Sequence, residues 1–412
     1  MRSKNFLIGA LVALAIAACS QVQIPAPATG TPLSNASSPT PVVIPETSTP
    51  VATVGNTPLA TPPNLPVLTS PALIHIAFLD ANNGWGVAIN DGGYVLRTVD
   101  GGATWLNATP VGLTGIGLST TFSVLDVNTA WALVPNADFF TGTLYRTSDG
   151  GLNWTSFPVP FGGGYLKFLD LHTGRALADR GAGAGSQSVE LFQTSDGGAS
   201  WMSVYNNDPT RADSSTSLPL GGIKNGMTFL DANTGWVTGM RPVDGEVYLF
   251  VTHDGGVSWE QQAMPLPAGY STYQYMPQPP VFFGNDGYLP LGIFMNSTTD
   301  FTFYVTHDGG TTWNGDPTNS SRVIKQGSYS FTDSMHGWSW DGGLNLYSTS
   351  DGTQTWGETT TNIDLSGRLS QLEFVPGADG QFVGWALTGQ DDAGASQLYK
   401  TTDNGVTWTL IP

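Results

Sequence analysis

The sequence predicts an all-β fold, a seven-bladed β-propeller of four-stranded antiparallel blades. Three observations support it: an eight-residue signature occurs seven times, a second motif precedes it in each unit, and no segment has the periodicity of an amphipathic helix. The copies are spaced by about 50 residues. Such spacing is typical of propellers and solenoids, in which one small unit is repeated because it cannot bury its apolar face alone.

The signature reads Thr-x-Asp-(Gly/Asn)-(Gly/Thr)-x-x-Trp and predicts a hairpin turn with a fixed tip. The Asp carboxylate accepts hydrogen bonds from nearby backbone N–H groups, the residues after it tolerate positive φ, and the Trp ring can fold back over the turn. We therefore expect a structural role for these acidic and indole side chains. They are Asp100, Asp149, Asp196, Asp254, Asp308, Asp351 and Asp403, with Trp105, Trp154, Trp201, Trp259, Trp313, Trp356 and Trp408.

A second motif precedes each signature and reads apolar-x-Asp, with Gly-Trp four residues after the Asp. The first unit has Asp80 followed by Gly84 and Trp85, whereas units five and seven keep only Gly287-Tyr288 and Gly384-Trp385. Together the two motifs contain twelve of the thirteen Trp residues. We therefore expect Trp to serve blade packing before binding.

The pattern of the first unit predicts four strands, at residues 74–79, 85–89, 94–99 and 105–108. In this interpretation both motif turns lie on one face of the propeller. The loops after the second and fourth strand of each blade lie on the opposite face, which we call the variable-loop face. Residues 64–72 are a candidate extra strand for closing the ring.

The first nineteen residues predict a lipoprotein signal. Arg2 and Lys4 precede an apolar run that ends in Ile16-Ala17-Ala18-Cys19, a small-residue pattern before the chain's single cysteine. We expect the mature chain to begin at an acylated Cys19 on the extracytoplasmic face of a bacterial membrane, attached through this anchor only. An ordinary secretory signal with an incidental cysteine is the alternative. The single thiol also argues against disulfides and a Cys nucleophile.

Residues 20–71 predict a disordered tether, and residues 72–412 the propeller. Between Ser20 and Ser70 there are eleven prolines and one charged residue, Glu46. Such a segment buries too little apolar surface to order itself, and proline favours extended conformations of about 3.1 Å per residue. The formal net charge of −18 argues against binding to nucleic acid or docking on anionic lipid.

The signature is that of Asp-box (BNR) propellers, and both motifs together resemble the photosystem II assembly and stability factor family. The resemblance covers residues 72–412 and is carried by turn-forming residues such as Phe78, Asp80 and Trp85. It implies Asp-box hairpins in every blade. It also implies a non-enzymatic scaffold outside the cytoplasm that holds a protein partner, expected here to be a membrane or cell-surface protein.

An Arg-rich surface is associated with partner binding in that family, which draws attention to the few basic residues of this chain. Arg97, Arg146 and Lys400 stand three positions before the signature Asp in units one, two and seven. A closed ring makes these units neighbours, so the three charges are a candidate partner-binding patch. Alternatively, each neutralises a nearby turn carboxylate.

The loops of the variable-loop face differ most in length and composition, and binding usually occurs on such loops. They include 135–142, with Phe139 and Phe140, and 264–280, with five prolines and three tyrosines. Exposed aromatic residues often anchor interfaces. The first candidate contact surface is therefore Tyr270, Tyr273 and Tyr275; alternatively, this loop packs over the edge of the adjacent blade.

Enzymatic alternatives follow from other Asp-box propellers, the sialidases and xyloglucanases. A sialidase needs three converging Arg residues and a Tyr nucleophile, and a xyloglucanase pairs two carboxylates across a cleft between two propellers. The chain lacks the sialidase Arg-Ile-Pro element and has one predicted propeller. We expect a monomer that binds rather than catalyses, with no cofactor and no metal. A carbohydrate-binding propeller without turnover is a further alternative.

Overall fold

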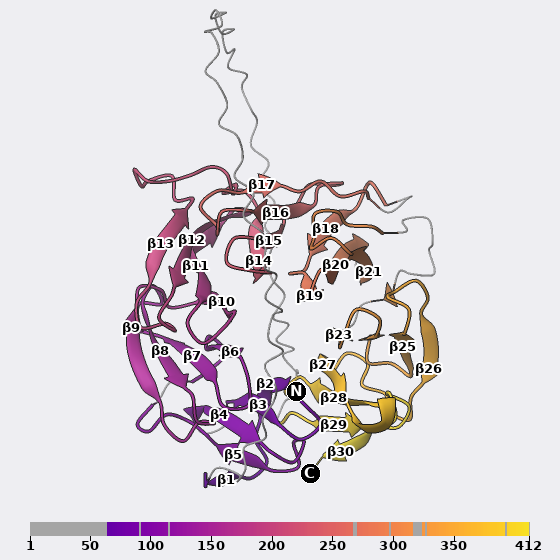
Figure 1. Cartoon of the computed structure of the whole chain (residues 1–412). Coiled ribbons are helices and arrows are strands. Elements are labelled where there is room, and N and C mark those ends of the chain that lie inside the picture. The colour runs from indigo at the N-terminus through magenta and orange to yellow at the C-terminus, as the bar shows by residue number, and fades with distance from the viewer. Residues whose placement is uncertain are drawn as a thin grey trace, which may run out of the picture. The chain divides into compact units, whose positions relative to one another are not determined.

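Strand pairing in the computed structural model confirms the predicted architecture. Seven antiparallel sheets follow one another along the chain and form the blades of a β-propeller (Figure 1). The structure describes residues 64–411 except 90–91, 114–115, 267–269, 296–297, 316–323, 326–327 and 392–393. Cys19 and most of the predicted tether lie outside the described residues. Within the described part of the chain, no helix is both long enough and apolar enough to cross a bilayer.

Blade one shows how closely the hydrophobic pattern located the strands. It consists of β2 (Leu73–Phe78), β3 (Gly84–Ala88), β4 (Tyr94–Thr98) and β5 (Trp105–Asn107), each within one residue of its prediction. Blade two contains β6 (Thr121–Val124), β7 (Ala130–Pro135), β8 (Gly142–Thr147) and β9 (Thr155–Val159). Blade three contains β10 (Gly164–Phe168), β11 (Gly174–Gly183), β12 (Ser186–Thr194) and β13 (Met202–Asn206). Blade four contains β14 (Ile223–Phe229), β15 (Gly235–Met240), β16 (Tyr248–Thr252) and β17 (Glu260–Gln261).

Blade five has an interrupted inner strand. Both β18 (Gln274–Pro277) and β19 (Val281–Phe283) pair with β20 (Asp286–Met295), and Pro279 and Pro280 lie between them. Proline has no N–H to donate to a sheet, so the strand breaks there. The blade ends with β21 (Thr298–Thr306) and β22 (Ile324–Lys325). Blade six contains β23 (Ser328–Phe331), β24 (Gly337–Trp340), β25 (Asn345–Thr349) and β26 (Gly357–Thr360), and blade seven contains β27 (Leu369–Pro376), β28 (Phe382–Thr388), β29 (Leu398–Thr401) and β30 (Thr409–Ile411).

The seven signature turns share one set of hydrogen bonds. In the first, Thr98 Oγ1 donates to Asp100 Oδ1 at 2.9 Å and accepts from Gly102 N at 2.8 Å, while Asp100 Oδ1 accepts from Thr104 N at 2.8 Å. The other six turns repeat these contacts. In blade one, Gly101 N also donates to Asn82 O at 2.7 Å, which places both motif turns on one face.

The residue after the Gly of the second motif, or after Ala130 in blade two, reaches the next blade, through a hydrogen bond in six blades and through the contact of Trp236 with Phe282 in blade four. The Trp131 ring lies parallel to that of Phe168 in blade three, with centroids 3.7 Å apart, and Trp131 Nε1 donates to Gly197 O at 3.0 Å. Such a contact combines ring stacking with a satisfied indole N–H. Equivalent donors and acceptors are Trp85 and Asp126, Arg175 and Ala232, Tyr288 and Ser334, Trp338 and Asn404, and Trp385 and Gly101.

The Gly of the second motif leaves room for this stacking. A Cβ on Gly235 would lie 2.5 Å from the Phe229 ring, closer than two carbon atoms approach. In blade two, Val124 takes the place of the facing Phe and Ala130 that of the Gly. The two facing positions are therefore filled either by a Gly with a large Phe or by an Ala with a smaller Val.

The ring closes without a strand shared between its first and last blades. The last four strands form blade seven, while β1 (Val67–Leu68) pairs with β5 on the outer edge of blade one. Segment 64–72 thus supplies a strand, although not one that joins the two ends, and the body begins before residue 72. Side-chain contacts join blade seven to blade one instead. Gln371 of β27 accepts a hydrogen bond from Ile76 N on β2 at 3.0 Å and donates one to Ile76 O at 2.7 Å.

Candidate partner-binding surface

Arg97 does not lie on the surface, so the predicted basic patch is wrong at this position. Its side chain is 0% exposed, and its guanidinium donates to Gly84 O and Asn83 Oδ1, both at 3.0 Å. The charged group lies over the Trp85 ring, 5.3 Å from the centroid. Burial lowers the pKa of Arg97 to about 10, so the residue remains a cation whose role here is to support the turn.

Arg146 and Lys400 are half-buried and reach across blade seams. Arg146 Nη1 lies 3.5 Å from Gly197 O in blade three, and Lys400 Nζ lies 3.2 Å from Ala81 O in blade one. Both cations thus donate hydrogen bonds to carbonyl groups of the next blade, and Lys400 also interacts electrostatically with the turn carboxylate of Asp100, in line with the alternative interpretation. Contact of either residue with a partner stays a prediction.

The tyrosine loop packs over an apolar cluster that blades four and five form together, which confirms the alternative interpretation that it covers the edge of an adjacent blade. Tyr275 is 0% exposed, and its hydroxyl donates to Tyr270 O at 2.5 Å. Tyr270 and Tyr273 are half-buried, with ring centroids 5.6 Å apart. Both pack on the apolar cluster that contains Trp236 and Trp313. The first-ranked contact surface is therefore wrong for Tyr275.

A different surface gathers the exposed aromatic residues. Of the Phe, Tyr and Trp side chains that the structure describes, only Phe139, Phe140 and Tyr165 are exposed, at 64, 55 and 39%. All three line one hollow of about 520 Å³ between blades two, three and four, together with Leu118, which is 81% exposed. We call this the aromatic hollow; it lies on the variable-loop face. The loop with Phe139 and Phe140 is one of the variable loops named from the sequence, although the tyrosine loop was placed before it as a candidate contact surface.

The loop that displays the two Phe rings is held in a fixed shape by its own side chains. Asp138 Oδ1 accepts hydrogen bonds from Phe140 N at 3.0 Å and Thr141 N at 2.9 Å, and Asn136 Nδ2 donates to Thr141 Oγ1 at 2.9 Å. Phe139 has φ of 59°, in the left-handed region that non-glycine residues rarely occupy. This conformation costs about 1–2 kcal/mol.

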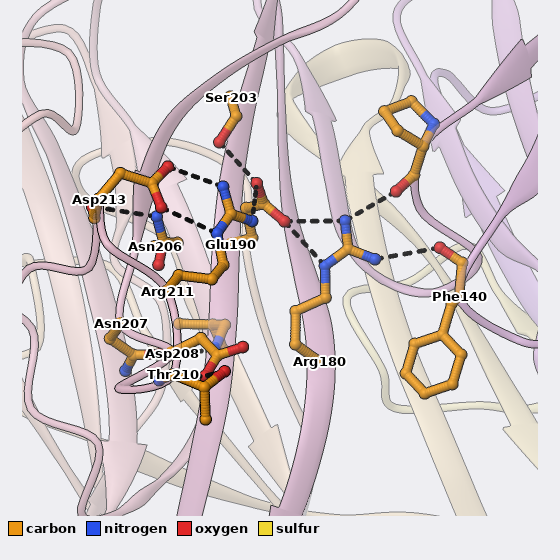
Figure 2. A network of polar contacts seen from close by, with 12 residues as sticks. Phe140, Arg180, Glu190, Ser203, Asn206, Asn207, Asp208, Thr210, Arg211 and Asp213 are labelled. Carbon is orange, nitrogen blue, oxygen red and sulfur yellow. Dashed lines mark hydrogen bonds and ion pairs between the residues drawn. The ribbon is translucent and has the colours of Figure 1, made fainter.

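A polar network around the buried carboxylate of Glu190 holds the same loop from blade three (Figure 2). Arg180 Nη1 donates to Phe140 O at 3.0 Å, and Arg180 Nη2 to Pro160 O at 2.7 Å. Its Nε donates to the buried Glu190 carboxylate at 3.0 Å. Arg211 Nη1 approaches the other Glu190 oxygen at 2.9 Å. Paired with two cations, the buried carboxylate is compensated, and Arg180 is kept in position to hold the loop.

The accessible charge in the aromatic hollow is negative. Asp179 lines it and is exposed. Lys224 also lines it but is 2% exposed, and its ammonium donates to the carbonyls of Gln187 at 2.9 Å and Pro219 at 2.8 Å. Burial lowers the pKa of Lys224 to about 8. A ligand would therefore meet the Asp179 carboxylate before any cation.

Other acidic side chains occupy two further hollows. Glu373 lines one between the inner strands of blades six and seven, where burial raises its pKa to about 8 and no second Asp or Glu lines the wall. Its oxygens accept from Phe78 N at 2.9 Å and Gln371 Nε2 at 3.1 Å. Asp254 and Glu260 share the other, where hydrogen bonds of the fourth signature turn hold Asp254. No group of three or more His, Cys, Asp or Glu side chains in the described ranges is placed to hold a metal ion.

Three solved structures align with most of this chain. The GH74 xyloglucanase from Xanthomonas campestris aligns with 82% of this chain and 55% of its own, at 16% identity and a TM-score of 0.50. YCF48 bound to D1 peptide aligns over 83 and 91% at 17% identity and 0.47, and YCF48 from Cyanidioschyzon merolae over 82 and 98% at 19% identity and 0.45. Likeness at these identities concerns the fold alone. No family model and no curated protein matches the sequence.

Proposed function

We propose that this protein is a non-enzymatic propeller that binds a membrane or cell-surface protein through the aromatic hollow, and that Cys19 anchors it on the extracytoplasmic face of a bacterial membrane. One observation carries the proposal: every exposed Phe, Tyr or Trp of the described chain lines the same hollow. Clustered exposed apolar groups, rimmed by polar ones, mark interaction sites far more often than single exposed residues do.

The loop that carries Phe139 and Phe140 is held in one conformation, which favours a role in binding for its exposed rings. Phe139 is in a left-handed conformation, and Arg180 together with Asp138 ties the loop at both its carbonyl and its N–H groups. Strain held by surrounding contacts is typical of functional positions. A preformed surface also loses little conformational entropy when a partner docks, which favours affinity.

The predicted tether suits a partner in or near the same membrane. An extended segment of this length would reach about 160 Å at about 3.1 Å per residue. Confinement to the membrane surface raises the effective concentration of the propeller near such a partner, so that a modest hollow suffices. Replacing Cys19 by Ala is expected to release the protein from membranes in fractionation while leaving its melting temperature unchanged.

The decisive test compares two matched double variants of the full-length protein in bacterial cells. Phe139→Ala with Phe140→Ala removes the aromatic rings, whereas Leu152→Ala with Val257→Ala removes exposed apolar groups of the signature turns. After cross-linking and purification, mass spectrometry should find a surface protein with the wild type and the control, and at least tenfold less of it with the Phe variant. Equal recovery with both variants would contradict the proposal.

The enzymatic and carbohydrate alternatives need their own measurement. Purified protein is incubated with fluorogenic sialosides and with xyloglucan, and is also applied to a glycan array. We expect neither turnover nor retention. Turnover would replace the proposal by glycoside hydrolysis, and retention on the array that disappears in the Phe139→Ala, Phe140→Ala variant would replace the protein partner by a glycan.

A further inference from the structure

The aromatic hollow has a chemistry that narrows the kind of partner, if the proposed function holds. We infer that it receives a peptide segment in which an Arg or Lys stands beside a large apolar residue, with Asp179 contacting the cation and Phe139, Phe140 and Leu118 contacting the apolar side chain. The occupant is thus a basic, apolar segment of a protein.

The residues that line the hollow support an apolar side chain in the bound peptide. Leu177 and Val189 line it, exposed by 1 and 2%, while Leu118, Phe139 and Phe140 stand out into solvent. A volume of about 520 Å³ lies within the range of roughly 300–1,000 Å³ of sites that enclose small ligands. It is large enough for one or two side chains of a peptide and too small for a folded domain.

Glycines on the rim let a peptide backbone approach. Gly162, Gly163 and Gly164 line the hollow one after another, and a Cβ on Gly163 would meet no atom within 4 Å. The space in front of Gly163 is therefore open. No left-handed φ is required there, so a larger residue at this position would project into free volume without backbone strain.

The basic half rests on Asp179, which takes part in no ion pair among the described residues. Its Oδ1 accepts from Gly181 N at 2.8 Å. The neighbouring cations are already engaged, because Arg180 contacts Glu190 at 2.9 Å and the Lys224 ammonium faces backbone carbonyls. The Lys224 ammonium attracts the Asp179 carboxylate electrostatically but forms no ion pair with it, so a cation from a partner could contact Asp179 directly.

The negative charge of the whole chain also favours a basic partner. A net charge of −18 repels acidic ligands and steers cationic ones toward the surface, and this steering weakens as salt is added. Complementary charge mainly sets specificity and association rate, while apolar contacts supply most of the affinity. The two halves of the occupant thus have separate roles and can be tested separately.

The test is selection of random heptapeptides displayed on phage against the full-length protein in detergent. Wild type should enrich peptides that place Arg or Lys next to Leu, Met, Phe or Trp. Gly163→Leu should abolish this enrichment by filling the hollow, whereas Gly183→Leu, at an equally open glycine of the β11–β12 hairpin, should not. Asp179→Asn should keep the apolar preference and lose the basic one, whereas Asp244→Asn, an exposed acid of another loop, should behave as wild type.

Affinity of one enriched peptide then gives the size of the effect. Fluorescence anisotropy should show binding to Asp179→Asn about tenfold weaker than to wild type, with a smaller salt dependence. Absence of enrichment, enrichment without basic residues, or equal binding to Gly163→Leu would overturn the inference. If cross-linking in cells still depends on Phe139 and Phe140 while peptides show no basic preference, the proposed function stands and only this inference falls.

Discussion

The two faces of the propeller carry loops that connect the same strands, but exposed apolar side chains are distributed differently on them. On the signature-turn face, exposed apolar residues occur singly, as Leu152, Val257 and Val406 do at the same position of three turns. On the variable-loop face, Leu118, Phe139, Phe140 and Tyr165 surround one hollow. The signature turns all keep one geometry because the ring is built from them. The variable loops are not constrained in this way and can bring several apolar side chains together.

Basic residues show the same contrast. Near the signature turns, Arg97, Arg146 and Lys400 contact backbone carbonyls of the blades. On the variable-loop face, Arg180 also contacts a carbonyl, but that of Phe140, and so fixes a loop that exposes two rings. The same chemistry stabilises the scaffold on one face and the candidate site on the other.

The largest expected effect lies at the blade seams. Replacing the fully buried Trp131 by Ala removes the stacking on Phe168 and the hydrogen bond to Gly197, and should lower the free energy of unfolding by about 3–5 kcal/mol. Urea unfolding followed by near-UV circular dichroism measures it. Leu152→Ala, on the exposed turn, should stay within about 0.5 kcal/mol of wild type; equal losses in both variants would remove the distinction between seam and turn.

A smaller effect is expected for Gly235→Ala, because the added methyl group would meet the Phe229 ring. Overpacking of this kind costs about 1–3 kcal/mol. Adding Phe229→Val recreates the Ala and Val pair of blade two, so the double variant should be destabilised by less than the sum of the two single changes. Simple additivity in urea unfolding would show that the repeat variation is not a packing pair.

The turn carboxylates predict how stability changes with pH. Hydrogen bonds from Ser200 lower the pKa of Asp196 to about 2, below the unfolded value of about 3.9. Its stabilising contribution is therefore complete above about pH 5 and is lost as pH falls toward 2. The melting temperature of wild type should fall over this range, and that of Asp196→Asn should fall less; identical profiles would argue against a role of this carboxylate.

The smallest effect on stability, and the opposite sign, is expected at the aromatic hollow. Phe139→Gly relieves the left-handed conformation and should leave the free energy of unfolding unchanged or raise it by up to about 1 kcal/mol. Capture of the partner should nevertheless decrease, because one exposed ring is lost. A clear loss of stability would mean that the ring supports the fold, and that the two faces do not differ as proposed.

The sequence located the scaffold well and the candidate site poorly. Strands of blade one were placed within a residue because their pattern is local, and the register of blade five confirms Tyr288 as the counterpart of Trp85 despite altered spacing. Arg97 and Tyr275 were misplaced on the surface. Whether such a side chain is covered depends on a neighbouring strand or loop distant in sequence, which no spacing reveals.

By itself the sequence determined the turns and the number of blades, because each turn is closed by hydrogen bonds within about eight consecutive residues. The second motif likewise marked the residues that build the seams. Only the tertiary structure decided which loop residues stay exposed. Phe139 and Phe140 face solvent beside Asp179 because blades two, three and four meet there and because Arg180, from another blade, holds their loop. Exposure is a property of what packs nearby in space, and that is set by the closed ring as a whole.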